Sequence, residues 1–216
     1  MIFLRKDRTI SKYRKYREVG KALNHKIIDR YINKEIILHS GKLLYLIKRD
    51  TLITDDELDI TALMDFSINE YQINGKKAVQ LYKDKVMLEN DIEEEILDAL
   101  IKSYTSLFKI ADIKQKDSKL ILADLLNKNR DTIEIIDMGF SQTAFPGLLI
   151  FLRIVPLPDF NITGGFGFAF HGDLEEYLLN EYKHFVKYVK SPRESIKRYV
   201  AFFKLYGRCG IESEFR

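Results

Sequence analysis

Apolar residues recur every three or four positions near the start of the chain. Between residues 10 and 32 this spacing, with basic side chains on the opposite face, predicts an amphipathic helix. Similar patterns predict helices over residues 34–48, 54–71, 76–88 and 91–105. Thr54 is the expected N-cap of the helix over 54–71, and Asn90 or Asp91 is the expected N-cap of the helix over 91–105.

The hydrophobic period changes near residue 107, where an extended run begins. Turn clusters at residues 116–118 and 127–129 separate β-rich runs. The last of these runs is apolar enough to be buried on both faces of a sheet. Strands are therefore predicted over residues 108–113, 120–123, 133–136 and 148–155.

A phenylalanine-rich segment follows. Phe160 and Ile162 alternate into Gly164-Gly165, a favoured hairpin pair, which predicts a turn at the two glycines. Phe166, Phe168 and Phe170 then alternate out of that turn. We expect these rings to fill a core, and the alternative is an exposed surface on which nucleic-acid bases stack.

The chain ends in two further predicted helices, over residues 174–189 and 192–206, with Asp173 and Ser191 as caps and Gly207 after the second. The predicted fold class is α+β: a mostly helical frame with a small antiparallel β-barrel or bent sheet of five to six strands. The predicted organisation is a helical region over residues 1–106, a β-module over 107–171 and packed helices over 172–216.

Composition adds an expectation about location. Cys209 is the single cysteine among 216 residues, so an internal disulfide is excluded and a reducing compartment is favoured. The first residues do not read as a signal peptide, and no apolar stretch approaches the length of a membrane span. We expect a cytoplasmic protein without a membrane partner.

Charge is unevenly distributed although the net charge is only +3. Residues 1–30 hold ten Lys or Arg and three Asp or Glu, whereas residues 89–98 hold six acids and no base. The basic helix either packs on this acidic segment or presents a nucleic-acid-binding face. The candidate binding residues of that face are Lys12, Arg14, Lys15, Arg17 and Lys21.

Arg153 is unusual because it interrupts an apolar strand. A charge there must be paired, reach an edge or lie in a site, and Asp124 or Asp137 is the predicted partner. These three residues form the candidate polar cluster. A metal-dependent hydrolase would need convergent carboxylates, for which the β-module offers Asp112, Asp124, Glu134, Asp137 and Asp159. No catalytic residue, metal site or cofactor is predicted.

Several short motifs of the β-module occur together: Leu107-Phe-Lys-Ile, Leu120-Ile-Leu-Ala-Asp124-Leu-Leu, Ile136-Asp137, Ser141, Pro146-Gly147-Leu-Leu, Leu152-Arg153-Ile-Val-Pro156-Leu and Gly164-Gly165. Over residues 107–171 the chain resembles the small β-module of poorly characterised bacterial proteins, some of which carry a SEC-C zinc tail. The cysteine cluster of that tail is absent here, so no metal is implied. The resemblance implies a fold and a bacterial source, and no activity.

The sequence leaves the function unknown. The leading hypothesis is a bacterial cytoplasmic binding or interaction protein without catalysis, whose partner is a protein or a nucleic acid. Its alternatives are nucleic-acid binding by the helix over residues 10–32 and metal-dependent hydrolysis by the β-module carboxylates.

Overall fold

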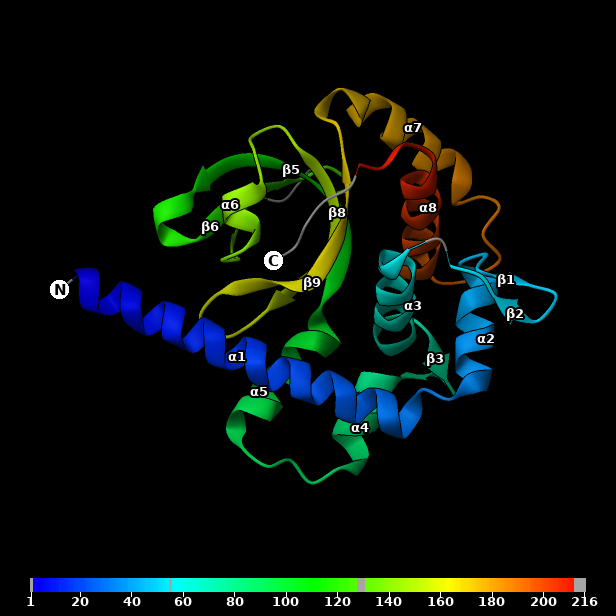
Figure 1. Cartoon of the computed structure of the whole chain (residues 1–216), viewed down its shortest axis with the longest axis horizontal. Helices are drawn as coiled ribbons and strands as arrows, with labels where there is room; N and C mark the ends of the chain where they lie inside the picture. The colour runs from blue at the N-terminus through cyan, green and yellow to red at the C-terminus, as the bar shows by residue number, and fades with distance from the viewer. Residues whose placement is uncertain (1, 55, 128–130, 212–216) are drawn as a thin grey trace.

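The computed structural model describes residues 2–54, 56–127 and 131–211. Five strands close into a barrel in the order β5-β6-β7-β9-β8, and helices from both ends of the chain surround it (Figure 1). The predicted α+β class, a helical frame with a small five-stranded barrel, is confirmed. The barrel strands are β5 (Tyr104–Lys114), β6 (Lys119–Asp124), β7 (Ile133–Ile136), β8 (Leu149–Pro156) and β9 (Asn161–Phe170).

One seam of the barrel differs from the predicted antiparallel arrangement. Strands β7 and β9 run parallel and pair at two positions, Ile135 with Asn161 and Ile136 with Ile162. The other four strand pairs are antiparallel. A parallel pair needs a long connection, which here contains β8 and the short helix α6 (Phe140–Thr143). The barrel is therefore mixed.

The hairpin predicted at Gly164-Gly165 is wrong. Strand β9 runs through both glycines, and the reversal between β8 and β9 lies at residues 157–160. Register shifts where Leu152 faces Gly167 and Ile154 faces Thr163, which marks a bulge in β9. Gly165 has φ +104°, and a Cβ on Gly164 would lie 3.0 Å from the Cβ of Arg153. The bulge therefore needs glycine at both positions, at Gly165 for its backbone angle and at Gly164 for the close approach to Arg153.

In the described residues before the barrel there are five helices, and two small hairpins interrupt them. The predicted helix over 34–48 is shorter than expected because Tyr45 adopts φ 62° and the chain then enters the first hairpin. The elements are α1 (Ile2–Tyr31), α2 (Lys34–Leu43), β1 (Ile47–Lys48), β2 (Thr51–Leu52), α3 (Glu57–Asn69), β3 (Gln72–Ile73), β4 (Lys76–Lys77), α4 (Ala78–Lys85) and α5 (Asp91–Lys102).

Helix caps follow the sequence in part. The Asn90 side chain accepts a hydrogen bond from the Glu93 N–H, so Asn90 rather than Asp91 is the cap of α5. The cap of α3 is Asp56 rather than Thr54. Ser191 does not cap the last helix, because its hydroxyl accepts from the N–H of Arg193 before the helix begins.

The remaining turns and helices complete the chain. The turn predicted at residues 116–118 is present, whereas residues 128 and 129 of the next predicted turn lie outside the described residues. The last helix continues through Gly207 and ends at Cys209, with Gly210 as its C-cap. The elements are η1 (Gln115–Asp117), η2 (Gly172–Leu174), α7 (Glu175–Phe185) and α8 (Glu194–Cys209).

Apolar side chains form three layers. One fills the barrel, a second lies between the outer face of the barrel and α3 and α8, and a third joins α1, α4 and α5 to the β8–β9 end of the barrel. Side chains of β8 alternate between the inner and outer layers, so burial of this strand on both faces is confirmed. The predicted boundaries at residues 107 and 171 stay a prediction.

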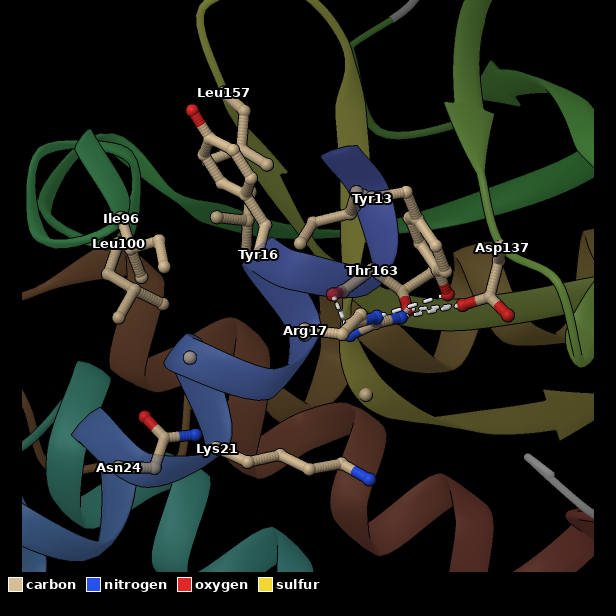
Figure 2. A pocket seen from close by; sticks show the side chains of 15 residues that line it. Tyr13, Tyr16, Arg17, Lys21, Asn24, Ile96, Leu100, Asp137, Leu157 and Thr163 are labelled. Atoms are coloured by element: carbon tan, nitrogen blue, oxygen red, sulfur yellow. Dashed lines mark hydrogen bonds and ion pairs between the residues drawn. The ribbon is translucent and has the colours of Figure 1, made fainter. Parts of the chain in front are cut away.

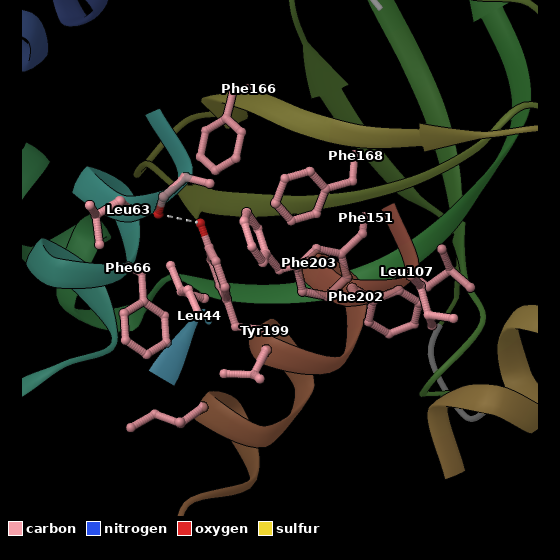
Figure 3. Packing of buried hydrophobic residues seen from close by; sticks show 14 of the residues in the cluster. Leu44, Leu63, Phe66, Leu107, Phe151, Phe166, Phe168, Tyr199, Phe202 and Phe203 are labelled. Carbon is pink, nitrogen blue, oxygen red and sulfur yellow. Dashed lines mark hydrogen bonds between the residues drawn. The ribbon is translucent and has the colours of Figure 1, made fainter. Parts of the chain in front are cut away.

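The phenylalanines of β9 belong to the second layer, as predicted for core residues. Phe168 and Phe170 are fully buried, and Phe166 is nearly so. Figure 3 shows Phe168 beside Phe151 of β8 and the aromatic side chains of α8. The ring centroids of Phe151 and Phe202 are 4.5 Å apart. A base-stacking surface on these rings is excluded because helix α8 covers them.

Hydropathy gives one more structural finding. Within the described part of the chain, no helix is both long enough and apolar enough to cross a membrane.

Candidate functional site

A pocket of about 280 Å³ opens between α1, α5 and the β8–β9 end of the barrel (Figure 2). Helix α1 passes over this end of the barrel in Figure 1 and forms one side of the pocket. Ile96 and Leu100 of α5 form another side, and the bulge glycines of β9 border it. The volume lies just below the range for small-molecule sites, about 300–1,000 Å³.

Helical spacing explains why α1 supplies so many pocket residues. Residues three and four positions apart lie on one face of a helix. Tyr13, Arg17, Gly20, Lys21 and Asn24 follow that spacing, and all five line the pocket. The apolar side chains of the same helix, Leu23 and Ile27 among them, are buried in the third core layer.

Arg17 fixes α1 to the parallel seam of the barrel. One guanidinium nitrogen donates to the carbonyl oxygen of Thr163 at 2.9 Å, and the other donates to Asp137 Oδ2 at 2.8 Å and to Thr163 Oγ1 at 2.6 Å. Its Nε donates to the Tyr13 hydroxyl at 3.1 Å. In Figure 2 the guanidinium points towards Asp137 and Thr163 under the Tyr13 ring.

Asp137 follows directly after β7 and is fully engaged. Its Oδ2 accepts from Arg17 and from the Thr163 hydroxyl at 2.7 Å, and its Oδ1 accepts from the Phe140 N–H at 3.0 Å. Its side chain is only 8% exposed. The carboxylate therefore serves as a fixed anchor, and its negative charge is balanced by Arg17.

Two polar groups of the pocket remain available. The Asn24 Oδ1 atom is buried and has no hydrogen-bond partner within the described residues. Lys21 is exposed, and no ion pair to it occurs in the part of the chain described. Three aliphatic side chains from the barrel end, those of Val155, Leu157 and Ile162, provide apolar surface next to them.

Gly20 is an unusual residue to find in the middle of a helix that lines a pocket. A glycine inside a helix costs about 1 kcal/mol relative to alanine. A Cβ built on Gly20 meets no atom within 4 Å, so packing does not require the glycine. Its position on the pocket wall leaves that space open.

The predicted polar cluster of Arg153, Asp124 and Asp137 does not assemble. Arg153 donates instead to both carboxylate oxygens of Asp65 at 2.9 and 2.8 Å and to Glu70 Oε1 at 2.9 Å. The outer face of β8 carries Arg153 towards Asp65 of α3 and Glu70, the C-cap of that helix, whereas Asp137 pairs with Arg17 of α1. The predicted partner was therefore wrong, although the expectation of a paired charge was right.

Asp124 has a local role. Its Oδ1 accepts from the Ser106 hydroxyl at 2.5 Å and from the N–H groups of Leu126 and Asn127 at 3.1 Å. Its Oδ2 accepts from the Asn127 amide at 2.8 Å. Such a pattern stabilises the turn after β6.

The residues of the predicted basic face fall into two groups, those with an ion-pair partner and those exposed to solvent. Lys12 pairs with Asp159 and Arg17 with Asp137. Arg14, Lys15 and Lys21 are exposed, so nucleic-acid binding stays a prediction for these three.

The acidic segment does contact α1. Lys26 pairs with Glu93 at 2.9 Å and with Glu89, and the Tyr16 hydroxyl donates to Glu95. Burial raises the pKa of Glu93, but the Glu89 N–H and Lys26 outweigh it and lower that pKa. The interpretation that the basic helix packs on residues 89–98 is supported by these contacts.

The hydrolase alternative finds no assembled site. Glu134 pairs with Lys119, Asp159 with Lys12, and Asp112 accepts from the N–H of its neighbour Ile113. Among the described residues, no group of three or more His, Cys, Asp or Glu side chains could hold a metal ion.

Comparison with known proteins gives a family. A family model, described as a family of unknown function (DUF7986), matches residues 7–216. The chain belongs to this family. No curated protein and no solved structure matches the chain. The pocket of this DUF7986 member must therefore be interpreted from its own residues.

Sequence patterns pointed to part of this pocket. Arg17, Lys21 and Asp137 were candidates for separate reasons, whereas Asn24, Gly20 and Thr163 were not candidates. The one available signal was Gly20, a glycine at an inward-facing position of a long helix.

Proposed function

We propose that this protein is a binding module without catalysis, and that it holds a small molecule in the pocket between α1 and the barrel. One observation carries the proposal: the buried Asn24 Oδ1 atom lines the pocket without a hydrogen-bond partner in the described chain. A buried unsatisfied polar group costs about 1–3 kcal/mol, and a bound ligand that donates a hydrogen bond would remove that cost.

The arrangement of the other groups supports binding rather than chemistry. Asp137 accepts three hydrogen bonds and is held by Arg17, which suits an anchor and not a mobile general base. Apolar walls with a few convergent polar groups are typical of small-molecule sites.

We also propose a bacterial, cytoplasmic location. The bacterial source rests on the resemblance of residues 107–171 to the β-module described above. The cytoplasmic location is supported by the single Cys209, which fits a reducing compartment. Fractionation of cells that express the protein tests the location.

A fragment screen followed by NMR tests the proposed function. The protein is labelled with ¹⁵N and mixed with small fragments of no more than pocket size. We expect bound fragments to shift the amide signals of Gly20, Gly164 and Gly165, which border the pocket. Shifts absent from these amides, or found on other surfaces alone, would exclude the pocket as the binding site.

A further inference from the structure

The charge left in the pocket is positive. Asp137 is balanced by Arg17, and both oxygens of the carboxylate already accept hydrogen bonds. The Lys21 ammonium lines the same pocket and has no ion-pair partner among the described residues. An anion is therefore the charged group that this pocket favours, because a cation would meet Lys21 without a free carboxylate.

The hydrogen-bonding capacity that remains is an acceptor. Asn24 Oδ1 is buried and unpaired within the described chain, so it requires an N–H or O–H group from the ligand. Lys21 and Asn24 are three residues apart on α1, a spacing that places their Cβ atoms about 5–6 Å from each other. Figure 2 shows the Lys21 side chain extending away from Asn24, so the exposed Lys21 has to adopt another rotamer to hold an anion beside the donor. With that rotamer, the anionic group and the donor lie close together in the ligand.

The rest of the pocket is apolar and small. Ile96, Leu100 and Val155 are among the side chains that supply its walls, and its volume is about 280 Å³. That volume corresponds to roughly nine water molecules at about 30 Å³ each. It fits a short aliphatic or aromatic body and excludes a folded partner.

We propose that the ligand is a small amphiphilic anion, with a carboxylate near Lys21, an adjacent N–H or O–H donor for Asn24 and an apolar body against the aliphatic walls. This ligand class rests on the proposed function of the pocket. Short N-acyl amino acids carry all three features, because the amide N–H stands one carbon from the carboxylate.

Three matched compounds test each feature by calorimetric titration. N-hexanoylglycine has the carboxylate and the donor, hexanoyloxyacetate replaces the N–H by an ester oxygen, and N-hexanoylglycinamide replaces the carboxylate by a neutral amide. We expect N-hexanoylglycine to bind about two- to tenfold tighter than the ester, from the worth of one hydrogen bond. We expect about a two- to fivefold advantage over the amide, from one exposed ion pair.

Variants assign each preference to its residue. Lys21→Met should remove the preference for the carboxylate and keep that for the N–H donor. Asn24→Leu should remove the preference for the N–H donor and keep that for the carboxylate. It should also raise the melting temperature of the free protein, because it removes the unpaired buried oxygen. Lys15→Met, an exposed lysine of α1 that does not line the pocket, should change neither preference.

The outcomes separate this inference from the proposed function. Equal binding of the three compounds, or tighter binding of the neutral amide, would overturn the ligand class. Absence of binding by all three, while fragments still shift the amides of Gly164 and Gly165, would also overturn it and leave the pocket as a binding site. Absence of both would contradict the proposed function itself.

Discussion

Arg153 is a charged side chain enclosed by the fold, with 2% of its surface exposed. Burial lowers the pKa of its guanidinium, but Asp65 and Glu70 outweigh that effect and raise the pKa. The guanidinium also donates to the Ser103 hydroxyl at 3.2 Å, directly after α5. One side chain of β8 thus connects the barrel to two helices of the N-terminal region.

Replacing Arg153 by Met should destabilise the protein by about 3–5 kcal/mol, because Asp65 and Glu70 would remain as buried carboxylates without their partner. Urea denaturation measures this change. The matched control is Arg208→Met, since Arg208 pairs with Glu181 at the surface and its loss should cost less than about 1 kcal/mol. Similar costs for the two variants would contradict the structural role of Arg153.

The lowered pKa of Glu93 predicts that the stability of the protein depends on pH. Its pKa in the folded protein is below the ordinary value of 4.5. Its contacts therefore contribute fully above pH 4.5, and the contribution is lost as the pH falls through the lower folded pKa. Glu93→Gln should lower the free energy of unfolding at pH 7 by about 1 kcal/mol. Between neutral and acid pH, the free energy of unfolding should then fall less in this variant than in the unchanged protein.

Urea midpoints measured from pH 7 to pH 3 test this expectation. Glu94→Gln serves as the control, because Glu94 is exposed and 3.5 Å from Lys83 at the surface. The account of the α1–α5 contact is wrong if the two variants follow the same pH curve.

At the scale of elements, α1 holds the weakest seam of the barrel. Strands β7 and β9 pair at two positions, and Arg17 bridges Asp137 after β7 to Thr163 in β9. Arg17→Met should destabilise the protein by about 1–3 kcal/mol, because Asp137 would lose a hydrogen-bonded cation. Amide hydrogen exchange should then be faster at Ile162 and its neighbours.

The control for this variant is Arg14→Met, since Arg14 lies on the exposed face of the same helix. Its exchange rates should match those of the unchanged protein. Unaltered protection of β9 in Arg17→Met would show that α1 does not hold the seam.

The exposed basic residues of α1 carry a separate prediction. If α1 binds nucleic acid, Arg14→Glu with Lys15→Glu should reduce affinity for an oligonucleotide at low salt, and the loss should shrink as salt is raised. Both residues are exposed, so the fold should be unaffected. A mobility assay in which the unchanged protein shows no shift at low salt would exclude this function.

Some helices and strands could be predicted from local sequence patterns, and others could not. The β-rich run of β6 and the apolar run of β8 predicted these strands because local composition determines both patterns. The Gly164-Gly165 pair was misread because a bulge and a tight turn both need glycine conformations. In the structure Gly164 lies against Arg153 of the neighbouring strand, a contact that is not local.

At the scale of the whole molecule, the sequence offered a barrel or a bent sheet, but it did not predict the parallel seam or the assembly of the pocket. The β7–β9 pairing joins Ile135 to Asn161, and Arg17 reaches Asp137 from 120 positions away. Such contacts depend on how α1 crosses the barrel. The sequence predicted a paired Arg153. Its partners are Asp65 on α3 and Glu70 directly after it, and no local pattern specifies where that helix lies.

The position of the pocket predicts an effect of ligand binding on the stability of the whole chain. It lies where the N-terminal helices meet the barrel, so a bound molecule would contact α1, α5 and β9 at once. Ligand binding should therefore raise the melting temperature of the whole chain, because a ligand that binds the folded state stabilises it by mass action.

The most direct measurement compares two glycine variants in the same fragment titration. Gly20 and Gly207 both lie inside helices, and a Cβ on either meets no atom within 4 Å, but only Gly20 lines the pocket. We predict that Gly20→Leu fills the pocket and abolishes binding of fragments that the unchanged protein binds, whereas Gly207→Leu leaves their affinity intact. Equal fragment affinity in both variants would contradict a ligand site between α1 and the barrel.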